Sequence, residues 1–282
     1  MDLIPAVRRG DIVRVRELLD SGEDPNTRDR SSKTALFWAT INRDIHIIRL
    51  LLDRGADINS QNDYGDTALI IESKQAYDHT KYCTDPFCSG CGQGDIAEFL
   101  LDREADPNIR DRDGTTALIW ASQRGNIEMV RLLLDRDVDP NIQNIKGDTA
   151  LINAARYSNS ILTLAAGTDY TKVVELLLRH GADPNIRNNR GKTASMIAER
   201  VDADDIARLI RDHIDLQRAR QRLAFATRLL GNDDDLDYDV TTRMADYLHD
   251  LDQYGSGKRS SSSSSSSRKR KNKYYTRRRS FF

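Results

Sequence analysis

The sequence predicts an all-α solenoid of about six stacked helix–turn–helix units with short hairpin loops. The first observation is a Thr-Ala pair that recurs at intervals of 33, 49, 33 and 44 residues. The second is Asp followed by Pro or Ile and then Asn, which recurs at the same intervals. The Thr residues are Thr34, Thr67, Thr116, Thr149 and Thr193, and the Asp residues are Asp24, Asp57, Asp106, Asp139 and Asp183. Two independent markers with one set of intervals define a unit of 33 residues.

Composition supports an elongated body with a distinct tail. Hydrophobic residues make up 38% of the 282 residues and charged residues 31%, which suits a thin stack better than a thick globule. Residues 255–282 hold ten of the 43 basic residues and no acidic residue, so the first 254 residues carry 33 basic against 44 acidic residues. No run approaches the ~18–20 apolar residues of a membrane span, so we expect no membrane partner.

The chain's location is predicted from its N-terminus and its cysteines. The N-terminus, MDLIPAVRRGDIV, lacks the basic and apolar regions of a secretory signal. All three cysteines lie between Cys83 and Cys91, which does not suggest a secreted disulfide framework. We therefore expect an intracellular monomer, in the cytoplasm or the nucleus.

The first helix of each unit begins at the Thr-Ala pair. The Thr hydroxyl is available there to accept a hydrogen bond from a backbone N–H of the first turn. Trp38 and Trp120 occupy equivalent positions in two of these helices. We expect both rings to lie in the core, because large aromatic side chains are mostly buried.

The second helix of each unit carries a Leu-Leu pair. These helices are expected at Ile45–Asp53, Ile96–Asp102, Ile127–Asp135 and Val173–Arg179, and the pairs are Leu18/Leu19, Leu51/Leu52, Leu100/Leu101, Leu133/Leu134 and Leu177/Leu178. Together with the Ala residues of the first helices, they form an apolar stripe that one unit cannot bury alone.

Glycine is expected to end the second helix in a left-handed residue, at Gly22, Gly55 and Gly181. Glu104 and Asp137 replace this glycine in two units. Each replacement costs about 1 kcal/mol, because a side chain is disfavoured in that conformation. The Pro of Asp-Pro-Asn then prevents the helix from continuing.

This unit resembles the ankyrin repeat, for example in DRDGTTALIWASQRGNIEMVRLLLDRDVDPNIQ at Asp111–Gln143. The family's usual Thr-Pro-Leu-His reads Thr-Ala-Leu-Phe, Thr-Ala-Leu-Ile or Thr-Ala-Ser-Met here. We expect this departure to weaken local rigidity without changing the fold. The resemblance implies two layers of antiparallel helices and projecting hairpins, curved around a concave face. The stack is expected over residues 1–213, with insertions near 75–94 and 157–169.

Ankyrin-like stacks present hairpin tips and first-helix surfaces to a protein partner, and this resemblance sets the candidate binding residues. They are Arg30, Tyr64, Asp66, Arg112, Asp113, Arg124, Lys146, Arg156, Tyr157 and Arg190. Tyr and Arg dominate binding hot spots, which favours Tyr64, Arg112, Arg124 and Tyr157. The alternative is that these are ordinary solvated positions.

The insertion in the third unit predicts a structural zinc ion. It offers His79, Cys83, Cys88 and Cys91, the four N or S ligands that tetrahedral zinc requires. A short inserted loop has little core of its own, so a metal would order it. The alternative is a flexible loop with free thiols.

The segment at 214–254 is predicted to be helical, with a helix at Asp215–Leu230. Farther along, its apolar residues are similar in spacing to the start of an F-box, with Asp237 in place of the family's Pro; they are Leu236, Val240, Met244, Tyr247 and Leu248. The whole layout resembles ankyrin proteins of large DNA viruses. It implies a substrate adaptor that docks on a cullin-type ubiquitin ligase. The alternative is a helix that packs on the last repeat.

The tail at 255–282 is predicted to be disordered, because its Ser homopolymer cannot build a core. The basic quartet Arg268, Lys269, Arg270 and Lys271 suits a nuclear import signal. Clustered cations with interleaved aromatics also suit nucleic acid. A disordered solubilising tail is the third interpretation.

The sequence contains no P-loop, no Gly-x-Gly-x-x-Gly after a strand and no convincing Ser-His-Asp or Cys-His arrangement. We therefore predict a non-enzymatic scaffold that binds protein through its concave face. The alternatives are the ubiquitin-ligase adaptor and a nuclear nucleic-acid-binding accessory that acts through the basic tail.

Overall fold

The computed structural model describes residues 2–75, 93–159 and 169–229. The chain divides into two compact units, Met1–Arg211 and Asp212–Phe282. Within the described residues the regular elements are helices, and one isolated antiparallel bridge joins Arg28 to Thr34. The all-α solenoid predicted from the repeat is confirmed.

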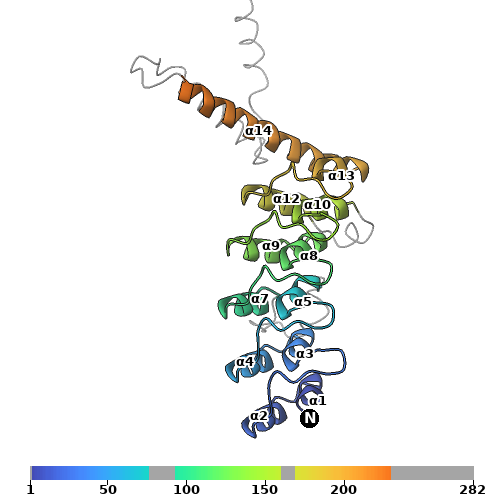
Figure 1. Ribbon diagram of the computed structural model, residues 1–282, viewed down its shortest axis with the longest axis vertical. Helices are drawn as coiled ribbons and strands as arrows, with labels where there is room; N and C mark the ends of the chain where they lie inside the picture. Colours follow the sequence, from blue (N-terminus) through green and yellow to red (C-terminus); the bar gives the residue numbers. More distant parts are fainter. Residues whose placement is uncertain (1, 76–92, 160–168, 230–282) are drawn as a thin grey trace, which may run out of the picture. The chain divides into compact units, whose positions relative to one another are not determined.

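The first compact unit, Met1–Arg211, is a stack of helix pairs in two columns (Figure 1). The first helices of the pairs are α1 (Leu3–Arg9), α3 (Ala35–Ile41), α5 (Ala68–Lys74), α8 (Ala117–Arg124), α10 (Ala150–Tyr157) and α13 (Ala194–Arg200). The second helices are α2 (Ile12–Asp20), α4 (Ile45–Asp53), α7 (Gln93–Asp102), α9 (Ile127–Leu134) and α12 (Tyr170–Arg179). Each first helix contacts the first helix of the next pair, so the stack grows one unit at a time.

The last described helix, α14, runs over Asp204–Leu229. The helix predicted at Asp215–Leu230 therefore begins earlier, at Asp204, within the compact unit Met1–Arg211. Asp204 and Asp205 lie in its first turn, where the helix dipole favours negative charge.

The Thr residues of the repeat cap the first helices as predicted. In α3, α5, α8, α10 and α13 the Thr Oγ1 accepts a hydrogen bond from the backbone N–H three residues later, at 3.3–3.5 Å. An Asx side chain does the same for α2, α4, α9 and α12; the capping residues are Asp11, Asp44, Asn126 and Asp169. Short helices need such caps, because their termini leave orphan N–H groups.

The core lies between the two columns. The first residue of each Leu-Leu pair is buried, and four of these five are fully enclosed: Leu51, Leu100, Leu133 and Leu177. They pack among the Ala residues of the first helices, for example Ala121 and Ala154, which are also fully buried. Each buried Leu contributes about 1.5–3 kcal/mol.

The second helices end in left-handed residues whether or not glycine is present. Gly55 and Gly181 both have φ of 85°, and Glu104 and Asp137 have φ of 65° and 56° at the equivalent positions. After Glu104 the same backbone bond follows as after glycine; the N–H of Ala105 donates to Leu100 O at 3.0 Å, as Ala182 does to Leu177 O. The packing of the units therefore imposes this conformation on residues that do not favour it.

Candidate protein-binding surface

Five hairpin loops project from the stack, and one Asx side chain fixes each of them. In every loop its Oδ1 accepts hydrogen bonds from the backbone N–H groups two and four residues later, at 2.8–3.0 Å. These residues are Asp29, Asn62, Asp111, Asn144 and Asn188. The loop backbones are thus held locally, and the two residues after each Asx form the tip.

Backbone hydrogen bonds join the last four hairpins to one another. The N–H of Arg112 donates to Tyr64 O at 2.9 Å, and the N–H of Ile145 donates to Asp113 O at 3.0 Å. The N–H of Asn189 likewise donates to Lys146 O at 3.0 Å. We call these four loops, 62–66, 111–115, 144–148 and 188–192, the hairpin strip.

Gly65 shows how closely the hairpins approach. Its φ is 78°, and a Cβ at this position would lie 2.8 Å from the backbone nitrogen of Arg112. Only glycine satisfies both conditions without moving a neighbouring backbone. The strip is therefore a preformed surface and not a set of independent loops.

The tips expose charged and apolar side chains to solvent. Arg30, Arg112, Asp113, Lys146 and Arg190 are exposed, as is Arg124 at the end of α8. None of these side chains forms an ion pair within the described part of the chain. Tyr64 is 64% exposed and so is available for contact.

Ile145 is a further exposed tip residue, outside the Tyr and Arg residues that were favoured as hot spots. It is 60% exposed, although Ile is usually buried. The signal was present in the sequence, because Ile145 follows Asn144 as Asp63 follows Asn62 at the start of a tip.

Asp66, Arg156 and Tyr157 are less available than the tips. Asp66 is buried and pairs with Lys74. Arg156 is half-buried and contacts Asp148 at 2.7 Å, and Tyr157 is half-buried. The charges of Asp66 and Arg156 are thus used within the stack.

Trp38 and Trp120 lie half-buried on the first-helix face, which corrects the expectation that they belong to the core. Each indole N–H donates to the Asp of its own hairpin, at 3.0 Å to Asp29 and 2.8 Å to Asp111. The indole nitrogen needs such an acceptor, which explains why the ring stays at the edge of the core. The sequence analysis did not anticipate this bond between residues nine positions apart.

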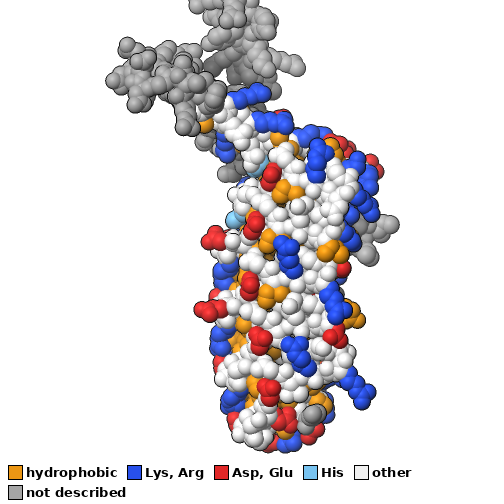
Figure 2. Space-filling model, viewed as in Figure 1, with side chains coloured by type: hydrophobic (Ala, Val, Ile, Leu, Met, Phe, Trp, Pro, Cys, Tyr) orange, Lys and Arg blue, Asp and Glu red, His pale blue; other side chains and the backbone are white. Residues whose placement is uncertain are grey.

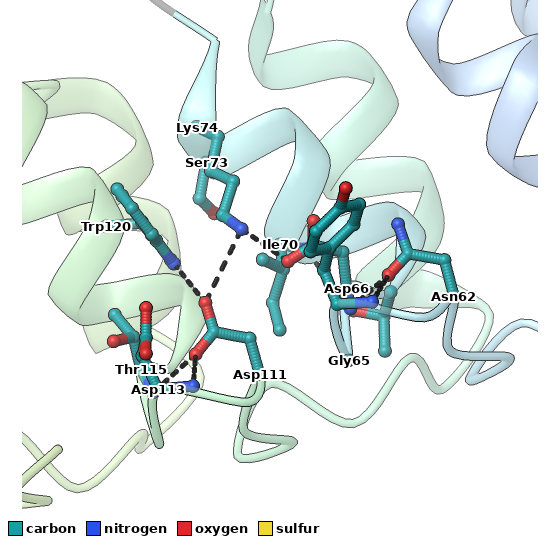
Figure 3. A network of polar contacts seen from close by, with 12 residues as sticks. Asn62, Gly65, Asp66, Ile70, Ser73, Lys74, Asp111, Asp113, Thr115 and Trp120 are labelled. Carbon is teal, nitrogen blue, oxygen red and sulfur yellow. Dashed lines mark hydrogen bonds and ion pairs between the residues drawn. The ribbon is translucent and has the colours of Figure 1, made fainter. Parts of the chain in front are cut away.

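Cations cover both Trp rings. The Nζ of Lys74 lies 4.5 Å from the Trp120 ring centroid and 3.4 Å from Asp111 Oδ2 (Figure 3). Arg8 and Lys33 lie over Trp38 at 4.5 and 4.8 Å. These cation–π contacts hold both indole rings against neighbouring side chains of the stack.

The hairpin carboxylate beside Trp38 is held ionised. Burial raises the pKa of Asp29, but N–H donors from Lys33, Ser31 and Trp38 outweigh it, so its pKa lies below the usual value. The carboxylate is therefore charged at neutral pH and continues to accept these bonds.

Glu72 is a buried acid on α5 that the sequence analysis did not single out. It is fully buried, where the equivalent residues of the other units are Ala39, Ala121, Ala154 and Ala198. Burial raises the pKa of Glu72 to about 7 against the opposing effect of Arg43, whose Nη1 lies 2.8 Å from Glu72 Oε2. Glu72 thus titrates near neutral pH.

Charges on the second-helix side are compensated between units. In each of three ion pairs, the Asp that ends one second helix contacts an Arg that follows the second helix of the next unit. The pairs are Asp20 with Arg54, Asp53 with Arg103 and Asp102 with Arg136, at 2.8–2.9 Å. His180 takes the place of Arg opposite Asp135, at 3.8 Å. Figure 2 shows basic and acidic side chains interspersed along the stack. Each exposed pair contributes about 0–1 kcal/mol.

Several predicted sites lie outside the described residues. These are the zinc ligands His79, Cys83, Cys88 and Cys91, the F-box-like residues Leu236, Val240, Met244, Tyr247 and Leu248, and the basic quartet Arg268, Lys269, Arg270 and Lys271. Among the residues that are described, no group of three or more His, Cys, Asp or Glu side chains is placed to hold a metal. No helix of that part is long and apolar enough to cross a membrane.

The stacked helix pairs and the bonded hairpin strip define a helical repeat protein with a candidate interaction surface. A family model described as ankyrin repeats in three copies matches residues 3–82 and 87–161, and a single-repeat model matches 146–189. The chain belongs to the ankyrin-repeat family. Domains of this family are in general protein–protein interaction modules, and the fold is typically non-enzymatic.

Solved ankyrin structures share the fold. An ankyrin repeat domain from Acinetobacter baumannii AYE is 29% identical, with a TM-score of 0.62 over 75% of this chain and 96% of its own. The ankyrin repeat protein EF0377 is 33% identical, with a TM-score of 0.60 over 73% and 94%. The ankyrin repeat domain of Bcl-3, a member of the IkappaB protein family, is 29% identical, with a TM-score of 0.57 over 73% and 81%. No curated protein matches the chain significantly.

Proposed function

We propose that the protein is a non-enzymatic scaffold that holds a protein partner on the hairpin strip and the adjoining first-helix face. The observation that carries this proposal is the combination of a fixed backbone with unpaired, exposed side chains. Inter-hairpin bonds at 2.9–3.0 Å order the strip before any partner arrives. A preordered surface binds at a lower entropy cost than flexible loops do.

Tyr64 and Arg112 are the proposed anchors of the contact. They belong to neighbouring tips, and a backbone bond between them fixes their separation. Truncation of a hot-spot Tyr or Arg costs at least about 2 kcal/mol, a loss of more than ten-fold in affinity.

The test is affinity purification with the full chain and a Tyr64→Ala/Arg112→Ala variant. Arg131→Ala is the matched control, because Arg131 is also exposed and forms no ion pair in the described part of the chain, but belongs to second helix α9. We expect the double variant to lose the partners that the wild type and the control both retain. Equal recovery by all three proteins contradicts the proposal.

An adaptor role is the second proposal, and the F-box-like spacing at 236–248 supports it. The resemblance of the whole layout to ankyrin proteins of large DNA viruses also supports this adaptor role. It predicts that Val240→Ala or Leu248→Ala loses ligase components while partners of the hairpin strip are still recovered. Retention of the ligase components, or loss of folding, counts against the adaptor.

A nuclear nucleic-acid-binding accessory is the third proposal, and the basic tail supports it. It predicts nucleic-acid binding that falls steeply with salt. The binding is expected to disappear when residues 255–282 are removed. Salt-insensitive binding contradicts this proposal.

A further inference from the structure

In two of the five Thr-capped units, an ion pair joins two equivalent positions on the first-helix face. One position is the residue before the capping Thr, and the other lies eight residues farther along, at or near the end of the first helix. Asp66 and Lys74 pair in this way on α5, and Asp148 and Arg156 pair at 2.7 Å on α10. An acid before the helix and a base near its end thus neutralise each other.

The last unit places two cations at these positions. Lys192 precedes the capping Thr193, and Arg200 ends α13; both side chains are exposed. Neither forms an ion pair within residues 2–75, 93–159 and 169–229. The carboxylate that completes this arrangement on α5 and α10 is missing here.

The adjoining hairpins extend this basic end. Lys146 and Arg190 are exposed on neighbouring tips, which the bond from Asn189 N–H to Lys146 O joins. Figure 2 shows several Lys and Arg side chains near α13, at the upper right of the stack, with a few acidic side chains among them. Two nearby acids are already engaged, because Asp148 accepts from Arg156 and Asn188, while Glu199 pairs with Arg211.

From this charge pattern we infer that the last unit binds an extended acidic segment of the protein partner. A partner carboxylate takes the place beside Arg200 and Lys192 that the Asp148 carboxylate takes beside Arg156. Further acidic residues of the partner lie along the hairpin strip past Arg190 to Lys146, and an apolar side chain of the partner packs on the exposed Ile145. This inference rests on the proposed scaffold function and specifies the chemistry of its partner.

The same surface favours protein over nucleic acid. Ile145 is 60% exposed beside these cations, and an apolar side chain suits a protein segment better than a phosphate backbone. Unpaired bases need aromatic faces for stacking, and the exposed residues of this basic end, Ile145, Lys146, Arg190, Lys192 and Arg200, include no aromatic side chain.

The test measures fluorescence anisotropy of a labelled peptide of alternating Glu and Leu with the full chain. A peptide of alternating Lys and Leu is the control ligand, and labelled duplex DNA is the second probe. Lys192→Asp is the informative variant, because it recreates the acid–base pattern of residues 66 and 74 and therefore preserves the fold. Arg131→Glu makes the same change in charge on the second-helix side.

We expect the acidic peptide to bind the wild type and Arg131→Glu, and to bind Lys192→Asp about 10–100-fold more weakly. Raising the salt concentration weakens the binding. Unchanged binding by Lys192→Asp, no binding of the acidic peptide, or DNA binding that the same variant abolishes overturns the inference. If Lys192→Asp still recovers the partners that Tyr64→Ala/Arg112→Ala loses, the acidic partner is wrong and the scaffold stands.

Discussion

Replacing Glu104 and Asp137 with Gly is predicted to stabilise the stack. Glu104 has a φ of 65° and Asp137 a φ of 56°, and the equivalent Gly22, Gly55 and Gly181 have φ values of 85–93°. The left-handed conformation costs a residue with a side chain about 1–2 kcal/mol. Glycine also gives the unfolded chain more freedom, which offsets about 0.4–1 kcal/mol. The net gain is about 0.5–1 kcal/mol per site.

The two sites lie in different units, so we expect their effects to add to about 1–2 kcal/mol. Urea unfolding measures the gain as a higher midpoint with an unchanged slope. Glu104→Ala is the control, because it removes the carboxylate but keeps the Cβ, and it should not stabilise. Equal stabilisation by Gly and Ala would refute the backbone argument and assign the effect to charge.

Three further predictions concern burial, loop contact and metal. The pKa of Glu72 rises from 4.5 to about 7 on folding, so between these pH values the folded chain binds more protons than the unfolded chain. Its free energy of unfolding therefore falls as the pH rises through this range. Chemical unfolding at pH 4.5 and 7.5 should show this loss, on the order of 2–3 kcal/mol, relative to Glu72→Gln; parallel curves would contradict it. Gly65→Ala should destabilise the stack by about 2 kcal/mol or more, because its Cβ would meet the backbone of the next hairpin in addition to the cost of the left-handed conformation. Gly55→Ala should cost about 1 kcal/mol, because a Cβ at Gly55 meets no atom within 4 Å. Equal urea midpoints would refute the contact between hairpins. Purified protein should contain zinc, and a chelator should expose Cys83, Cys88 and Cys91 to thiol reagents; unchanged thiol reactivity would count against the site.

Local pattern was enough to predict the architecture of the stack. The capping Thr residues and the Leu-Leu pairs act within one unit or between adjacent units, so their spacing carries the information. The left-handed residues at Glu104 and Asp137 followed from their alignment with Gly55 and Gly181.

Interactions between particular side chains were not predicted in the same way. Trp120 stays at the core edge because Asp111, nine residues earlier, accepts its N–H, and Glu72 is buried against Arg43 of the preceding unit. The uncompensated pair of Lys192 and Arg200 becomes visible only when the equivalent positions are seen to hold ion pairs elsewhere. Sequence reasoning identified the exposed tips, and the structure adds which of their neighbours are already engaged.

Hydrogen–deuterium exchange with and without the recovered partner tests the central claim most directly. We predict that bound partner slows exchange in the hairpin strip, at residues 62–66, 111–115, 144–148 and 188–192, and leaves the second helices α4 and α9 unchanged. Slowed exchange on the second helices, with no change in the strip, would contradict the claim that the hairpins form the protein-binding surface.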